Sequence, residues 1–589
     1  MEVLEQNDQA IVFCRSKASA QKTAEHLAET VQGYLNDDNR TVLLRLVAQL
    51  REDEDAPEEI AEFLEQGVCY HHAGLTREAR AMVEDAFRGR HLKVICCTPT
   101  LAAGVNLPAR LVVVRDVYRS EYVRGRWYKV TLSTGELLNM LGRAGRPGQV
   151  LDGRGLAIIE PGVLPARDVE QLQIGIRQGR GNEVLSQLPQ SFDNLMRFVL
   201  QVISDRSEAT LGDIAQALEK TLWYHVNPKD ISFDRPIQAD IMEDIPAFER
   251  VDSSIKLLRV WPMADGVSGV VQSGSKTYDF TMGLTGETCT CPAKSKWQRG
   301  ELCKHLACAL NSILFGFRVD PEVRSRALYV SARRFVSTLD PGSMIKIALD
   351  LLTEWNLLTK VPGAYRVTPV GAVAANSSFD VLLVRIAQDR LRACNEIPLI
   401  SAVAEWLVED FYADEKQRGR WASALSQWID EVDEKRVRLP EPYRGDFEQG
   451  LERLGDLSNL YAEVAAQLGK PALAERCREA RGCIVYGVHP DIVPLAALRI
   501  RRLGRARCRI LNDQKGIRNL EGLASADPRI LAHSRIPPAV AAQFVTKAKE
   551  IAEARNRIRQ SEDPTTETDV FLAQFMVDRL LITDNKVTG

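Results

Sequence analysis

The sequence predicts a multidomain protein in which an α/β domain is followed by a winged helix, interrupted by a small ββα metal-binding insertion, and then by an all-α region. Three observations predict this order. Short apolar runs alternate with helical-period stretches over residues 1–165. Cys and His residues are grouped within residues 289–305, and residues after 380 show helical periodicity alone. At 589 residues the chain is too long for one hydrophobic core.

Composition and charge are those of an ordinary globular protein. Hydrophobic residues make up 45% and charged residues 26% of the chain, so most of it can bury enough apolar surface to fold. The sequence has neither a membrane-length apolar run nor an apolar signal segment, so we expect a cytoplasmic protein with no membrane partner. The net charge of -3 requires that any nucleic-acid binding use local basic patches. Residues 494–560 form one, with fifteen Lys and Arg against five Asp and Glu.

Residues 1–165 alternate predicted strands with predicted helices, which indicates a parallel sheet. Ligands of open α/β sheets bind beyond the carboxyl ends of the strands. We therefore expect ligand contacts in Thr98–Pro108, the loop that follows one of the apolar runs. The runs that predict strands are Ala10–Arg15, Val94–Cys97, Leu111–Val114 and Leu156–Ile159.

The segment Leu141–Pro147 (LGRAGRP) has two arginines three residues apart, near enough to face one target if the segment is helical. Guanidinium pairs suit phosphate, and solvated surface ion pairs are the alternative for GRAGR taken alone. Together with IVFCRSK, YHHAGL and TPTLAAGVNLP in this order, the segment resembles motifs IV to VI of superfamily 2 helicases, closest to the superkiller-like group of the archaeal DNA-repair type. Residues 1–165 would then be a helicase C-terminal, second RecA-like domain.

The resemblance implies roles for individual residues. Arg143 and Arg146 would reach the γ-phosphate of ATP across an interdomain cleft, with Arg146 as the arginine finger. Gly104 and Asn106 would couple ATP to nucleic acid, Gly142 would contribute to the nucleotide site, and Thr98 would contact nucleic acid. The sequence departs from the family at Asn139, where a longer Gln or Glu is usual.

The sequence lacks the motifs by which the first motor domain of a helicase binds ATP and magnesium. It contains no GxxxxGK[ST] phosphate loop and no DExH or DEAD cluster that could hold magnesium. Because phosphoryl transfer depends on both, we expect the isolated chain to be inactive and to use ATP and Mg²⁺ only with the missing first motor domain. That N-terminal helicase half could be supplied in cis or in trans, so both a truncated gene product and one subunit of a split helicase remain open.

Residues 166–227 and 326–380 predict the two parts of a winged helix. Two short amphipathic helices joined by a polar turn follow Phe192, as in helix-turn-helix units. The remaining helix, Met344–Trp355, and two wing strands at 356–360 and 365–368 come only after a long insertion.

The insertion, residues 228–325, carries the array C-x-C-x11-C-x-H formed by Cys289, Cys291, Cys303 and His305. Three thiolates and one imidazole predict a closed, tetrahedral, structural zinc site. A β-hairpin is expected between Val270 and Phe280 and a helix after the last ligand. Spacing and surroundings resemble the SWIM zinc finger, which implies contact with DNA or with protein. Four unrelated core residues are the alternative interpretation.

Helical periodicity continues through residues 381–480 and predicts a bundle. The helix beginning near Gly445 resembles the family's ratchet helix, which makes Arg453 a candidate nucleic-acid contact, with a solvated surface position as the equal alternative. Residues 481–560 resemble a helix-hairpin-helix domain with a turn at Gly504, and residues 561–589 form a tail. An ordinary solvated basic face is the alternative here also. The candidate nucleic-acid contacts in this domain are Arg501, Arg502, Gly504, Arg505 and Arg507.

Two functions follow from these patterns. The first is the C-terminal portion of an ATP-dependent DNA-repair or replication-fork helicase that translocates 3′ to 5′ on single-stranded or forked DNA, with RNA not excluded. The second is a non-catalytic, zinc-dependent subunit that binds nucleic acid or protein.

Overall fold

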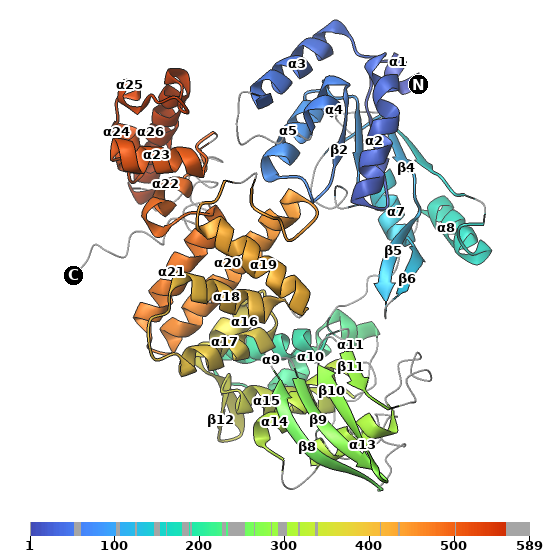
Figure 1. The fold of residues 1–589 in the computed structure, drawn as a ribbon. Helices are drawn as coiled ribbons and strands as arrows, with labels where there is room; N and C mark the ends of the chain where they lie inside the picture. Colours follow the sequence, from blue (N-terminus) through green and yellow to red (C-terminus); the bar gives the residue numbers. More distant parts are fainter. Residues whose placement is uncertain are drawn as a thin grey trace. The chain divides into compact units, whose positions relative to one another are not determined.

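The computed structural model contains two compact units (Figure 1). The first joins Met1–Val184 to Gln427–Glu452 and Val485–Gly589, and the second joins Leu185–Ser426 to Arg453–Ile484. The residues that the structure describes are 2–51, 60–99, 101, 107–123, 126–145, 153–160, 162–179, 188, 191–226, 231, 233, 254–263, 266–283, 286–291, 303–315, 319–335, 340–412, 414–433, 436–500 and 502–560.

The first unit begins with an α/β domain on a five-stranded sheet of order β2-β3-β1-β4-β7, in which every neighbouring pair is parallel. The predicted parallel α/β domain is thereby confirmed. The sequence did not predict β2, and β7 begins two residues before the expected start because this exposed edge strand lacks the apolar run of a buried one. The strands are β1 (Ala10–Phe13), β2 (Val68–His71), β3 (Val94–Cys97), β4 (Leu111–Val114) and β7 (Arg154–Ala157).

Helices of this domain start at side-chain caps. The Ser16 and Thr76 hydroxyls accept backbone N–H groups at the starts of α2 and α5, and Ser133 forms a capping box with Glu136 at the start of α7. Helix α2 packs against β2 and β3, and α7 packs against β4. The helices are α1 (Glu2–Glu5), α2 (Lys17–Gln32), α3 (Asp37–Arg51), α4 (Ala61–Glu65), α5 (Arg77–Arg88), α7 (Thr134–Leu141) and α8 (Ala166–Gln178).

The core of the domain lies between these helices and the sheet. All four residues of β1, β2 and β3 are buried, including Cys96 and Cys97, as expected for thiols in an apolar strand. An antiparallel hairpin, β5 (Tyr118–Val123) and β6 (Arg126–Thr131), separates β4 from α7 and was not predicted.

The second unit brings together segments from both sides of the long insertion. Helix α9 packs against α15 and α16, and Ala209 after α9 forms a β-bridge with Tyr365 in β13. The expected pair of strands at 356–368 is present as antiparallel β12 and β13. The elements are α9 (Phe192–Arg206), α10 (Leu211–Glu219), α11 (Leu222–Val226), α14 (Pro321–Phe335), α15 (Pro341–Glu354), β12 (Leu358–Val361), β13 (Ala364–Val367) and α16 (Pro369–Asn376).

The insertion contains a larger sheet than the expected ββα unit. Four antiparallel strands have the order β11-β10-β9-β8, and the predicted hairpin is only its β9–β10 part. The first strand escaped prediction because a register shift between Leu257 and Arg259 and a proline at position 262 break its alternation. The elements are β8 (Ile255–Met263), β9 (Gly266–Ser273), β10 (Lys276–Gly283), β11 (Gly286–Cys289) and the following helix α13 (Lys304–Phe315).

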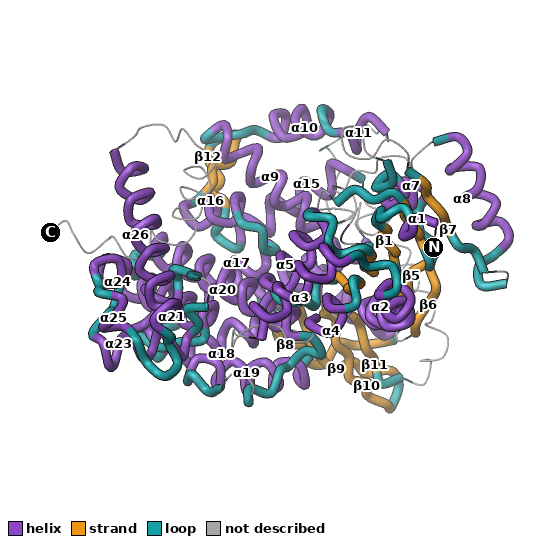
Figure 2. The backbone as a smooth tube through the Cα atoms, turned by 90° about the horizontal axis from the view of Figure 1, so that it is seen from above, coloured by secondary structure: helices purple, strands orange, loops and turns teal. Residues whose placement is uncertain are grey.

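The remainder is rich in helices, as Figure 2 shows. In the second unit the fully buried Tyr461 hydroxyl contacts the Asp410 carboxylate, which also accepts Arg390 at 2.7 Å, and this network joins three helices. None of the helices in the described part of the chain has the length and apolar character that a membrane span requires. The helices are α17 (Val381–Ala393), α18 (Ile400–Phe411), α19 (Glu415–Ile429), α20 (Arg444–Gln467) and α21 (Pro471–Tyr486).

Residues from Val488 to Ile551 form a separate hydrophobic core within the first unit. We call residues 485–560 the C-terminal helical domain. The predicted tail, 561–589, lies outside the described residues. The elements are a 3₁₀ turn (Pro490–Ile492), α22 (Val493–Ala496), α23 (Arg505–Lys515), α24 (Leu520–Ser525), α25 (Pro528–Leu531) and α26 (Pro538–Gln560).

Candidate functional site

The carboxyl edge of the parallel sheet holds Thr98, one of the predicted nucleic-acid contacts. Thr98 follows β3 directly, is buried, and donates its N–H to the His71 carbonyl at 3.3 Å. Gly104 and Asn106 of the same loop lie outside the described residues.

The GRAGR segment follows the C-terminal end of α7 and lies beside Ala109, just before the amino end of β4. Helix α7 ends at Leu141, and Gly142 caps it by donating its N–H to the Leu138 carbonyl at 2.8 Å. Ala144 then forms a parallel bridge with Ala109, so the segment is not helical as the arginine spacing had suggested. Gly145 has a φ of +67°, a left-handed conformation that favours glycine and turns the chain away from the bridge.

Arg143 is buried at this position, with 8% of its surface exposed. Burial raises the pKa of the Cys97 thiol well above its usual value, and the positive charge of Arg143 partly opposes that rise. Arg146 lies outside the described residues, and Asn139 is exposed on α7.

The loop between β2 and α5, which contains the HHAG sequence, is held by the start of α20. The Gly445 N–H donates to the Gly74 carbonyl at 3.0 Å, and a Cβ atom at Gly445 would lie 2.2 Å from the Leu75 carbonyl oxygen. Lys17 pairs with the Asp446 carboxylate at the same junction. The glycines therefore allow a backbone approach that no side chain could permit.

His72 is the buried centre of this junction. Its ring lies 5.2 Å from the Tyr443 ring in an edge-on arrangement, and its Nδ1 accepts the Gly74 N–H at 3.1 Å. Burial lowers the pKa of His72 to about 4, and the charge of Lys17 adds to this effect. The histidine is thus neutral at pH 7. Sequence patterns could not predict the contact of His72 with Tyr443, because some 370 residues separate the two.

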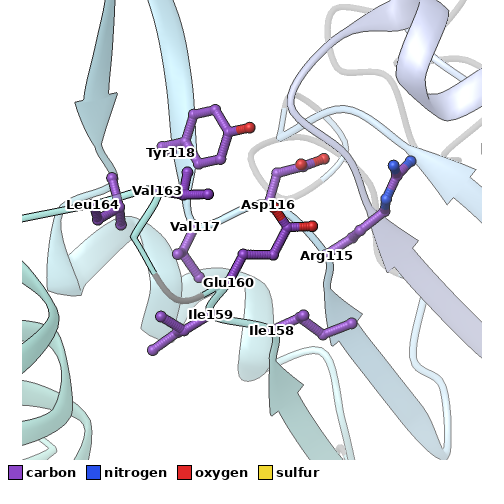
Figure 3. Close-up of a pocket in the computed structure, with 9 residues that line it drawn as sticks. All are labelled: Arg115, Asp116, Val117, Tyr118, Ile158, Ile159, Glu160, Val163 and Leu164. Atoms are coloured by element: carbon purple, nitrogen blue, oxygen red, sulfur yellow. The ribbon is translucent and has the colours of Figure 1, made fainter.

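A shallow pocket lies beyond the ends of β4 and β7 (Figure 3). Tyr118 and the Asp116 carboxylate lie on one side of it, and Ile158 and Ile159 lie on the other. The Asp116 carboxylate accepts a hydrogen bond from the backbone N–H of Arg15 at 3.2 Å. None of the predicted site residues lines this pocket.

The four predicted metal ligands come together. Cys289 at the end of β11, Cys291, Cys303 and His305 at the start of α13 are all buried, and their ligand atoms lie within 4.8 Å of one another. Cys303 donates to Cys289, which lowers the pKa of Cys289 to about 6 and raises that of Cys303. Three converging sulfurs and one imidazole fit a tetrahedral metal ion. Cys308 is buried in α13 beside them, as expected for a bystander.

The predicted nucleic-acid residues separate into two groups. Arg453 is exposed on α20, and Arg502 and Gly504 are partly exposed before α23, whereas Arg501 lies outside the described residues. Arg505 and Arg507 are buried.

The buried pair uses its donors inside the protein. The Arg505 guanidinium lies 4.2 Å from the centre of the Trp428 ring and donates to the Trp428 carbonyl at 3.1 Å. Arg507 donates to the carbonyls of Arg502 and Arg535, both at 2.7 Å. Both arginines therefore position the surrounding backbone, which revises their predicted role as direct contacts.

Comparison with known proteins identifies the type of the α/β domain. Residues 38–148, which include β2, β3, β4 and α7, match the family described as the helicase conserved C-terminal domain. The first unit therefore contains a helicase C-terminal α/β domain with a parallel sheet.

Individual relatives are similar over a longer stretch. The chain is 42% identical over 160 residues to the ATP-dependent DNA helicase Hel308 of Methanocella arvoryzae, which covers 27% of this chain and 21% of that protein. Identity to Hel308 of Pyrococcus abyssi is 35% over 218 residues, or 37% of this chain and 29% of the relative. The matched part thus spans less than a third of these relatives. This chain is therefore similar to part of these ATP-dependent DNA helicases.

Proposed function

We propose that the chain is the C-terminal portion of an ATP-dependent DNA helicase that couples nucleotide hydrolysis to 3′ to 5′ translocation once a first motor domain is joined to it. The observation that carries the proposal is the match of residues 38–148, which include Arg143, to the helicase C-terminal domain. In this proposal Arg143 and Arg146 contact the γ-phosphate, Arg146 as the arginine finger. Gly104, Asn106 and Gly142 complete this side of the nucleotide site.

ATP and Mg²⁺ would be held mainly by the first motor domain. The 589 residues contain no GxxxxGK[ST] phosphate loop, so a partner half supplied in cis or in trans must provide the phosphate cradle and the metal ligands. Bound Mg²⁺ would neutralise charge on the β- and γ-phosphates. The arginines of this chain would then orient the γ-phosphate and stabilise the charge that develops on it.

DNA would be gripped by the remaining domains. In the proposed arrangement residues 166–227 and 326–380 form a winged helix interrupted by a SWIM-type finger at 228–325. Residues 381–480 form the ratchet bundle, in which Arg453 contacts the strand, and residues 481–560 form the helix-hairpin-helix domain. Thr98, Arg501, Arg502 and Gly504 are the other proposed contacts, with single-stranded or forked DNA as the partner.

The proposal is tested by complementation. The purified chain is assayed for DNA-stimulated ATP hydrolysis alone and after mixing with a separately expressed phosphate-loop half of a Hel308 relative. We expect no hydrolysis by the chain alone and strong stimulation of the half. Equal rates with and without this chain would contradict the proposal. Substituting RNA for DNA in the same assay decides the nucleic-acid preference.

A second candidate function is favoured by the Cys and His cluster. A non-catalytic, zinc-dependent subunit would use the insertion to bind nucleic acid or protein. We propose that Cys289, Cys291, Cys303 and His305 hold one structural zinc ion, because all four ligands come from the chain and leave no open position.

Metal analysis of the purified chain tests the zinc site. One zinc per chain is expected, with loss of the metal in Cys303→Ser and retention in Cys308→Ser, whose sulfur is also buried in α13. Equal zinc content in both variants would contradict the ligand assignment.

A further inference from the structure

The C-terminal helical domain contains a structural repeat with an offset of 33 residues. Buried positions of residues 498–511 recur at 531–544, although the side chains differ. The matched pairs, all buried, are Leu498 and Leu531, Leu503 and Ile536, Cys508 and Ala541, and Leu511 and Phe544. A helix also starts at matched positions, α23 at Arg505 and α26 at Pro538.

Backbone hydrogen bonds of the two segments repeat with the same offset. The Leu503 N–H donates to the Ile500 carbonyl at 2.9 Å, and the Ile536 N–H donates to the His533 carbonyl at 2.9 Å. The helix after each turn begins with a matched hydrogen bond. The Cys508 N–H donates to the Gly504 carbonyl at 3.0 Å, and the Ala541 N–H donates to the Pro537 carbonyl at 2.9 Å. The described residues of 500–504 and residues 533–537 therefore form two similar turns, although Arg502 has a positive φ and Arg535 does not; we call them the first and second hairpin turns. Sequence patterns revealed only the first, since the second has no glycine.

One buried side chain holds the two turns together. Arg507 has 6% of its surface exposed, and its guanidinium donates to the carbonyls of Arg502 and Arg535. Those two residues occupy matched positions, one in each hairpin turn. A rigid guanidinium that bonds both carbonyls at 2.7 Å fixes the spacing of the turns. Arg502 also has a φ of +67°, a conformation in which glycine would be favoured over arginine.

The paired turns carry only positive charge. Residues 497–507 and 530–540 contain no Asp or Glu. Arg535 and Ser534 are exposed in the second turn, and Arg502 is partly exposed in the first. This composition suits the phosphates of a nucleic-acid backbone, which exposed arginine, hydroxyl and N–H groups bind without reading sequence.

We propose that the second hairpin turn is an additional nucleic-acid contact and that both turns form one two-point grip on backbone phosphates, with Arg502 and Arg535 as the matched contacts and Arg507 as the positioning residue. This inference rests on the proposed function, which supplies the nucleic acid, and adds a second half to its C-terminal contact surface.

Binding of the full chain to fluorescent forked DNA, measured by anisotropy over a range of salt concentrations, tests the grip. Arg535→Ala and Arg502→Ala should each weaken binding roughly fivefold at low salt and reduce the slope of log affinity against log salt by about 0.9, the value for one phosphate contact. The double variant should lose about twice that slope. Lys549→Ala, an equal charge change at an exposed position of α26 outside both turns, should keep the wild-type slope.

The outcomes separate this inference from the proposed function. If Arg535→Ala binds like Lys549→Ala while Arg502→Ala weakens binding, the second turn is not a contact. If neither arginine matters although the chain binds DNA, the grip is refuted, whereas the helicase proposal, measured through ATP hydrolysis, is unaffected. Unchanged thermal unfolding of the variants shows that the binding losses are direct.

Discussion

In the α/β domain, Arg143 is buried in the turn after α7, whereas in the C-terminal helical domain Arg505 and Arg507 are buried and donate to backbone carbonyls. All three are nearly fully buried, and all three belong to arginine-rich stretches of sequence. Their surroundings differ. Arg505 and Arg507 donate to carbonyls of their own chain and so fix the fold, whereas Arg143 belongs to the matched helicase C-terminal domain and is proposed to contact a nucleotide. Arginine density in a sequence therefore does not by itself separate structural from binding roles.

The largest effect on stability is expected from Arg505→Ala. This change leaves the carbonyls of Trp428, Gly487 and Val432 without their buried donor and removes the contact with the Trp428 ring. The free energy of unfolding should fall by about 3–5 kcal/mol, as measured by urea denaturation. Arg529→Ala, at an exposed position of the same domain, should change it by less than about 0.5 kcal/mol. Equal effects of the two substitutions would remove the distinction between buried and exposed arginines.

A smaller effect should appear in the α/β domain as a pH dependence. The pKa of His72 is lowered to about 4 in the folded protein. Between about pH 6.5 and pH 4, His72 is therefore protonated in the unfolded chain but still neutral in the folded one. The unfolding free energy should therefore decrease as pH falls from about 6.5 to about 4. His72→Asn keeps an acceptor near the Gly74 N–H and should flatten this part of the profile. An unchanged profile would contradict the assigned burial of His72.

The smallest effect is expected at the first hairpin turn. Arg502→Gly should raise the unfolding free energy by about 0.5 kcal/mol, because glycine adopts a φ of +67° without a steric cost. Arg502→Ala is the control, because it removes the same side chain but keeps a Cβ atom and so keeps the steric cost of the left-handed conformation. Equal stabilities of the two variants would show that the left-handed conformation is not strained.

Much of the α/β domain and of the metal cluster could be predicted from local sequence. The strands at Val94–Cys97 and Leu111–Val114 are continuous apolar runs, and a buried parallel strand has that signature. The ligands Cys289 and Cys303 belong to close pairs whose chemistry alone suggests a shared ion. Local patterns predicted these features because the residues that define each strand or ligand pair are close together in the sequence.

Contacts between distant parts of the chain could not be predicted in this way. The junction of Gly74 with Gly445 depends on a backbone approach between segments with no shared pattern. The inward direction of Arg505 depends on carbonyls near residue 430, about 75 residues away, and basic residues are exposed far more often than buried. The second hairpin turn lacks the glycine that marks the first, so burial and hydrogen bonding identify it where sequence does not.

The central claim is that Arg143 and Arg146 act on a nucleotide held with another domain. The most direct test is DNA-stimulated ATP hydrolysis by the helicase assembled from this chain and a phosphate-loop half, with Arg143→Ala, Arg146→Ala and the exposed control Arg88→Ala. The account predicts that Arg146→Ala lowers turnover by about a thousandfold, that Arg143→Ala also lowers it strongly, and that both keep DNA binding. Turnover in both variants equal to that of Arg88→Ala would contradict it.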